Sequence, residues 1–173
     1  MELIPALRVT RFEQLDAGEL FISFSGHERF YALKTLRERG ADQAQMVVLG
    51  PQFIAGGNES FLLNWQASTV LSYGKEFAVL PSPHPEHWLE DGNRRAPVCL
   101  AISDDQVYIC TNGGHSPSMY TPRYVNMATG AVERRLSSAV FTTHWRIEIV
   151  SPDRQPLVLI QFPSSPPIDQ GNR

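Results

Sequence analysis

Apolar and polar residues alternate over short segments along much of this chain, the pattern of strands that bury one face. Each segment is bounded by Gly, Pro, Asn or a cluster of polar residues, as strands in antiparallel sheets usually are. Strands are expected at residues 20–24, 30–34, 45–49, 60–64, 69–72 and 76–80, and then at 98–102, 106–111, 123–127, 139–142, 145–150 and 157–162. The pattern therefore predicts a mainly β protein built from antiparallel sheets.

The two series of predicted strands follow the same order and contain similar residues at matching positions. The aligned pairs are Tyr31 with Tyr108, Val47 with Val125, Val70 with Val140, Phe77 with Ile147 and Val79 with Ile149. Residue identity between the two halves is low, so an internal duplication and a coincidence of two strand-rich segments both stay open. The corresponding organisation is a first β half (1–83), a connector (84–93), a second β half (94–162) and a disordered tail (163–173). The halves form either two small barrels or one pseudo-symmetric sandwich.

One segment also fits a helix. Ser25 and Glu28 have the spacing of a capping box, apolar residues recur at helical spacing from Phe30 to Leu36, and Gly40 stands where a helix would end. The same residues read as a hairpin that turns near Gly26. A mainly β fold is preferred, and an α+β fold with a helix near residues 26–39 is the alternative.

Turn residues fix further details of the second half. Gly130 follows a predicted strand where a left-handed residue lets the chain reverse. Pro152 and Asp153 predict a turn that joins strands 145–150 and 157–162. The second of these strands, "LVLIQF", is apolar at consecutive positions. Such a run predicts a strand that is covered on both faces and central to the core.

Both cysteines fall on one predicted hairpin. If the chain turns at Asp104 and Asp105, Cys99 and Cys110 lie opposite each other at a hydrogen-bonded position of the ladder. The side chains diverge more at such positions than at the alternating ones, which disfavours a disulfide. We expect two reduced, buried thiols, with a disulfide as the alternative.

Charge and composition narrow the function classes. The chain has 173 residues, 42% hydrophobic residues and a formal net charge of −3. It carries no basic field for a polyanion, so nucleic acid is an unexpected partner. The opening "MELIPALRVT" lacks the basic start and apolar run of a signal peptide, and no segment approaches the length of a membrane span. These features predict a cytoplasmic protein without a membrane partner.

The strongest candidate for site chemistry is the segment "SPHPEHWLED". His84, Glu86 and His87 lie close enough in sequence to bind a divalent metal ion. Pro83 and Pro85 interrupt any regular helix there, and the spacing differs from that of the HExxH motif, so a solvated connector without a cofactor is preferred. His115 and His144 are interpreted as loop and core-edge residues.

The sequence contains no recognisable catalytic motif, and neither cysteine lies in a known catalytic context. The sequence therefore predicts a non-catalytic binding or structural module that acts through protein–protein contacts, either with another protein or by self-association into a homodimer through strand edges. A metal-dependent hydrolase using His84 and His87 is one alternative, and a weak nucleic-acid-binding module is the other.

Overall fold

A computed structural model describes residues 7–25, 28–36, 45–49, 62–64, 69–89, 99–112, 122–150 and 155–163. The strands of these segments form three antiparallel sheets, and the helical elements among them are single 3-10 turns. The predicted mainly β, antiparallel fold is therefore confirmed. None of the helices in this part of the chain is long and apolar enough to cross a membrane.

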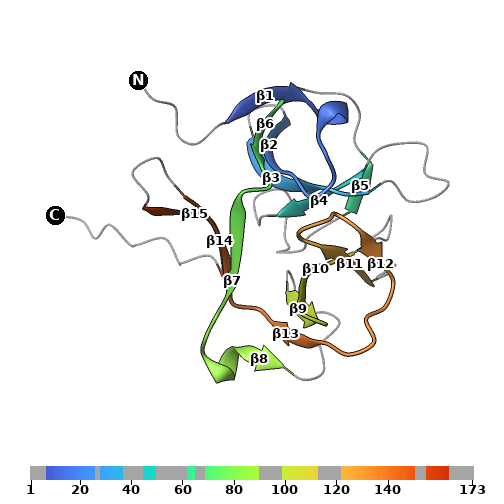
Figure 1. Ribbon diagram of the computed structural model, residues 1–173, viewed down its shortest axis with the longest axis vertical. Helices are drawn as coiled ribbons and strands as arrows, with labels where there is room; N and C mark the ends of the chain where they lie inside the picture. Colours follow the sequence, from blue (N-terminus) through green and yellow to red (C-terminus); the bar gives the residue numbers. More distant parts are fainter. Residues whose placement is uncertain are drawn as a thin grey trace.

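The first sheet has six strands in the order β1-β6-β2-β3-β4-β5 (Figure 1). Their bounds are β1 Arg8–Arg11, β2 Leu20–Ser25, β3 Glu28–Lys34, β4 Gln45–Leu49, β5 Leu62–Asn64 and β6 Thr69–Gly74, with the 3-10 turn η1 at Phe12–Gln14. The helix alternative near residues 26–39 is wrong where the structure describes it, because 28–34 form β3. This strand has partners on both sides, β2 and β4, and it packs apolar side chains on both faces, a stronger constraint than local helix capping.

The second sheet also has six strands, in the order β12-β11-β10-β9-β13-β8. Their bounds are β8 Trp88–Leu89, β9 Leu100–Ser103, β10 Gln106–Asn112, β11 Pro122–Asn126, β12 Val132–Glu133 and β13 Val140–Thr142, with the 3-10 turn η3 at Pro85–His87. Read from its other edge, the order is β8-β13-β9-β10-β11-β12. Each strand of the second sheet therefore occupies the place of the strand in the first sheet whose number is lower by seven, so that β8 corresponds to β1 and β13 to β6.

The third sheet joins the two halves. It contains β7 Phe77–Pro81, β14 Trp145–Val150 and β15 Pro156–Phe162, in the order β15-β14-β7. Phe77 pairs with Ile149 and Val79 pairs with Ile147. The sequence alignment places Phe77 on Ile147 and Val79 on Ile149, so an exchange of the two halves maps this pairing onto itself. The paired strands are thus related by a local twofold axis at Ala78 and Glu148.

The faces on which aligned residues lie support one pair in the alignment of the two halves and correct another. Val47 and Val125 both belong to the central core, as aligned positions should. Tyr31 faces that core, whereas Tyr108 packs in a separate cluster on the opposite face of its sheet. Their alignment is wrong by one residue, since a shift of one position along a strand moves a side chain to the other face. The order of strands does not establish how the two halves arose, so duplication stays a prediction.

One buried cluster draws on all three sheets, and two smaller clusters belong to single halves. The central cluster comprises Leu20, Leu33, Val47, Leu49, Leu100, Ile109, Val125, Met127, Trp145, Ile147, Ile160 and Phe162. A second cluster around Phe12 and Phe21 lies within the first half, and a third contains Cys99, Ala101 and Cys110 in the second half. Each half therefore has a small core of its own and shares a larger one, an arrangement between two barrels and one sandwich.

The two halves also meet at a pair of close backbone approaches. The Leu36 amide donates to the Gly130 carbonyl at 2.8 Å, and a Cβ added at Gly18 would lie 2.3 Å from the Ala128 carbonyl oxygen. Gly130 has a φ of +70°, and a Cβ added there would lie 2.5 Å from the Lys34 carbonyl oxygen. The turn after β11 therefore needs glycine both for its backbone conformation and for its contact with the first half.

The predicted strands of both halves are present, with ends that differ by up to two residues, and sequence reasoning missed the short strands β1, β8 and β12. A strand is present at residues 157–162, but the prediction that it is covered on both faces is wrong. Because β15 is the edge strand of its sheet, Leu157 and Val158 are 41% and 45% exposed rather than covered on both faces. The turn at Pro152 and Asp153 and the tail from residue 164 lie outside the described residues.

Candidate functional surface of the third sheet

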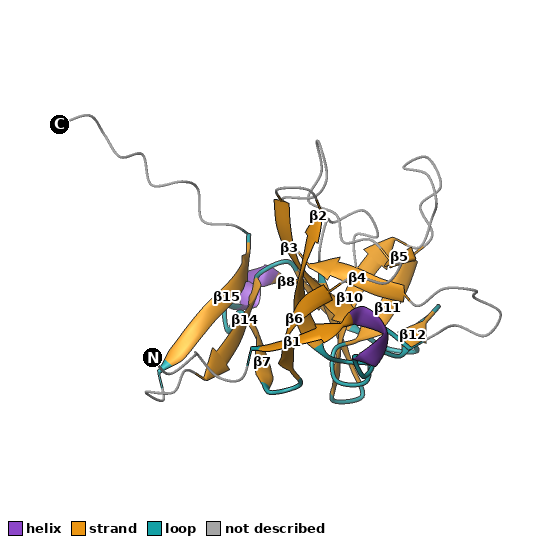
Figure 2. Ribbon diagram, turned by 90° about the horizontal axis from the view of Figure 1, so that it is seen from above, coloured by secondary structure: helices purple, strands orange, loops and turns teal. Residues whose placement is uncertain are grey.

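The outer edge of β15 is an apolar surface without charge. The strand, Pro156–Phe162, contains no ionisable side chain and pairs with β14 on one side. Val150, on the neighbouring strand, is 65% exposed and adds to the apolar area around Leu157 and Val158. In both views the order from outside to inside is β15, β14 and β7, so β15 lies away from the two six-stranded sheets (Figures 1 and 2). No other described strand pairs with the main-chain groups on its far side, so these groups are available to a further strand.

The other sheet edges in the described part of the chain are short, charged or turned inward. Strand β1 carries Arg8 and Arg11, and charged side chains protect an edge from pairing with another chain. Strands β5, β8 and β12 have only two or three residues. Strand β7 lies on the side of its sheet that faces the rest of the molecule (Figure 1). Among the described edges, β15 is therefore the longest one that is both uncharged and outward-facing.

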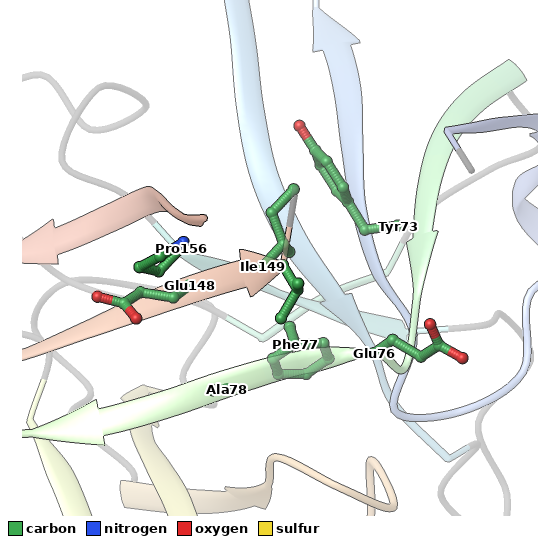
Figure 3. A pocket seen from close by; sticks show the side chains of 8 residues that line it. Tyr73, Glu76, Phe77, Ala78, Glu148, Ile149 and Pro156 are labelled. Atoms are coloured by element: carbon green, nitrogen blue, oxygen red, sulfur yellow. The ribbon is translucent and has the colours of Figure 1, made fainter. Parts of the chain in front are cut away.

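A shallow groove of about 310 Å³ lies at the hairpin end of the third sheet. Phe77 and Ile149 form its apolar floor, and the carboxylates of Glu76 and Glu148 point away from them (Figure 3). Tyr73 lines the groove and stacks on Tyr31, with ring centroids 6.3 Å apart. Burial raises the pKa of Tyr73 to about 12, so its hydroxyl stays protonated at neutral pH. The groove therefore offers apolar contact and a neutral hydroxyl.

A cleft of about 680 Å³ lies at the opposite end of the same sheet and holds three histidines. His84 and His87 come from the loop after β7, and His144 precedes β14. The pairing of β7 with β14 brings these segments together, and the Ser82 amide donates to the His144 carbonyl at 2.8 Å. The rings of His87 and His144 stack with centroids 3.6 Å apart and an interplanar angle of 5°. Burial lowers the pKa of His144, and the adjacent His87 lowers it further.

Hydrogen bonds within the loop account for the position of His87. The Ser82 hydroxyl lies 2.6 Å from His87 Nδ1, and the Ser82 carbonyl accepts a hydrogen bond of 2.9 Å from the Trp88 indole. The His87 amide donates to the His84 carbonyl at 3.0 Å. The serine and histidine therefore close the loop on itself, a structural role that needs no reaction.

The predicted metal ligands lie near each other without forming a chelating set. His84 Nδ1 is 3.7 Å from Glu86 Oε1, and both side chains are largely exposed. Within the described residues, no three His, Cys, Asp or Glu side chains are arranged to hold a metal ion. The stacked rings of His87 and His144 direct their nitrogen lone pairs in parallel planes, whereas metal ligands converge on one point.

Sequence reasoning missed the contact of His144 with His87. The only available signal was the position of each histidine just beyond a strand of the third sheet, and that signal needs the pairing of β7 with β14 to be known. His115, a further candidate, lies outside the described residues.

Comparisons with protein-family models, with curated proteins and with solved structures found no match to this chain.

Proposed function

We propose that this chain is a non-catalytic binding module that forms a homodimer when β15 of one copy pairs with β15 of a second. The observation that supports the proposal is an outward-facing, uncharged edge strand with Leu157 and Val158 41% and 45% exposed. An unprotected edge of this kind is a template for strand addition, which supplies main-chain hydrogen bonds and buries the exposed side chains.

A second copy fits this edge better than an unlike chain for two reasons. Antiparallel pairing of β15 with itself brings no like charges face to face, because the strand has none. The paired sheets would also continue as one six-stranded sheet, β7-β14-β15-β15-β14-β7. The chain already joins its own halves by antiparallel pairing about a local twofold axis, and the dimer would repeat that contact.

A bulge limits where the copies meet. Ile147 pairs with Ile160 and Glu148 with Val158, so Leu159 is an extra residue that increases the local twist of β15. The exposed side chains lie on the hairpin side of this bulge. We therefore expect the contact to centre on Leu157 and Val158, with each lying opposite the other across the twofold axis.

Sedimentation velocity tests the proposal on the full chain over roughly 1–200 µM, the range of a weak to moderate dimer. The wild type is expected to shift from monomer to dimer within this range. Val158→Lys should weaken the dimer by about tenfold or more, since it places a charged side chain opposite Leu157 of the second copy and removes apolar contact. Val9→Lys is the matched control, because Val9 is an exposed valine on another edge strand, β1, and should leave the dimer unchanged.

Two results would overturn the proposal. The first is a wild type that stays monomeric across the whole range. The second is a dimer that Val158→Lys does not weaken while circular dichroism shows an intact β fold, since the contact would then lie elsewhere or involve other residues. Binding of an unlike protein by a monomeric chain would replace the homodimer with a different partner.

A metal-dependent hydrolase in the histidine cleft has less support, because the stacked rings do not converge on one point. The observation that favours the hydrolase is the grouping of His84, His87 and His144 in one cleft. Titration with Zn²⁺ in a calorimeter separates the two functions. Binding near one equivalent that is lost in His84→Ala and His87→Ala would favour the metal site, and the homodimer predicts no such saturable binding.

A further inference from the structure

Cys99 and Cys110 face each other across the hairpin of β9 and β10. Asp104 and Asp105 form its two-residue turn with φ values of +49° and +60°, which fit a type I′ turn. The ladder then runs from Ser103 opposite Gln106 to Leu100 opposite Ile109, and the Cys110 amide donates to the Cys99 carbonyl at 2.8 Å. The cysteines thus occupy the hydrogen-bonded position that the sequence predicts, and both thiols are free.

The two thiols differ in acidity because they interact with each other. The Cys110 thiol hydrogen-bonds to the Cys99 sulfur and lowers the pKa of Cys99 despite its burial. The same hydrogen bond, together with burial, raises the pKa of Cys110. The Cys99 thiol therefore loses its proton more readily, and Cys110 holds a proton beside it. The residues are 6% and 8% exposed, so each retains a small contact with solvent.

We propose that Cys99 and Cys110 form a site of reversible oxidation, at which hydrogen peroxide converts the two thiols into a cross-strand disulfide. The Cys99 thiolate attacks one peroxide oxygen, the O–O bond breaks, and the leaving hydroxide takes up a proton as water. Cys99 then carries a sulfenic acid. The Cys110 sulfur attacks that sulfur and displaces its hydroxyl, which leaves as the second water. Two thiols and one peroxide thereby give one disulfide and two waters.

The position in the sheet allows this bond to form and makes it easy to reduce. Paired Cα atoms at hydrogen-bonded positions lie about 5.5 Å apart, within the range that a disulfide spans. The side chains at such positions diverge, so the closed bond carries strain, and strained disulfides have higher reduction potentials and are the labile ones. The pair therefore suits a modification that thiols in the surroundings reverse, rather than a permanent structural bond.

Mass spectrometry of the intact native protein tests the proposal. Because the chain has only 2 cysteines, no other thiol contributes to the measured change in mass. After treatment with equimolar hydrogen peroxide, the mass of the monomer should fall by about 2 Da, the mass of the two hydrogens lost from the thiols. Alkylation in denaturant should then find no free thiol, and dithiothreitol should restore both. Oxidation of the folded chain should be at least about tenfold faster than in denaturant, because the fold holds the thiols together.

A register variant provides the matched control. Cys110→Ser combined with Thr111→Cys keeps two thiols on the same strands but moves one to the opposite face of the sheet. This variant, and the single variant Cys110→Ser, should gain oxygen or form intermolecular dimers instead of losing 2 hydrogens. The proposal is wrong if the wild type keeps both thiols while free glutathione in the same tube is consumed, if it gains oxygen on both cysteines, or if the register variant closes its disulfide as fast.

Discussion

Truncation of Ile147 to alanine tests whether the three sheets share one core. Ile147 is fully buried in β14, where it pairs with Val79 on one side and Ile160 on the other. Its cluster includes side chains from both six-stranded sheets. Removal of the side chain therefore opens a cavity that is lined by all three sheets, rather than by one half alone.

The expected cost follows from this position. Truncation of a buried isoleucine to alanine costs about 2–5 kcal/mol, and the cost rises where rigid surroundings cannot collapse into the cavity. Strands on both sides of β14 fix the walls here, so we expect a loss of about 3–4 kcal/mol in the free energy of unfolding. For a chain of 173 residues, this loss lowers Tm by roughly 6–16 °C.

Thermal and urea unfolding, followed by circular dichroism and by tryptophan fluorescence, measures the effect. Val150→Ala is the matched control, because Val150 lies on the same strand, is 65% exposed, and should change stability by less than about 0.5 kcal/mol. Ile147→Ala should shift a single transition that both probes report at the same midpoint. A loss below about 1 kcal/mol, or a variant in which one half melts separately, would refute the shared core.

Three further substitutions test the electrostatics and the contact between the halves. Burial alone would raise the pKa of Glu19, but hydrogen bonds from Ser72 and Asp16 and the charge of Arg8 lower this pKa overall. The Glu19 carboxylate therefore stabilises the fold at pH values above its ordinary pKa of 4.5, and this stabilisation is lost as the pH falls. Acid unfolding curves should show a weaker pH dependence in Glu19→Gln than in the wild type. The lowered pKa of His144, due to burial and then to His87, means that stability should decline as pH falls below 6.5, and His144→Gln should flatten that decline in urea titrations at pH 5 to 8. Gly130→Ala should lower the free energy of unfolding by more than about 2 kcal/mol in urea, because its Cβ meets the Lys34 carbonyl. Gly74→Ala has a similar φ but open space around the new Cβ, and it should lower the free energy of unfolding by roughly 1 kcal/mol. Equal losses in the two variants would contradict the role of the contact.

Local pattern was sufficient to predict the strands and the hairpin of the cysteines. Alternation and turn residues place β4 and β14 at their observed bounds. Asp104 and Asp105 mark the hairpin because Asp tolerates the left-handed backbone conformation that both residues adopt. The helix alternative near residues 26–39 arose from equally local signals, and contacts with β2 and β4 decided against it.

Features that depend on long-range pairing were not predictable in the same way. The apolar run 157–162 has the same composition in a buried strand and in an exposed edge strand, so the sequence cannot distinguish a central position from an interface. The stacking of His87 on His144 requires the pairing of β7 with β14 across the two halves. The short strands β1 and β8 have little periodicity and are defined by their partners β6 and β13.

Hydrogen–deuterium exchange at two protein concentrations is the most direct test of pairing between copies of β15. At about 1 µM the outward-facing amides of residues 157–162 should exchange freely, and at about 200 µM they should become protected as the dimer forms. Strand β1, an edge without a partner in the proposed dimer, should exchange at the same rate at both concentrations. Exchange of residues 157–162 that does not depend on protein concentration would contradict the proposed role of this edge.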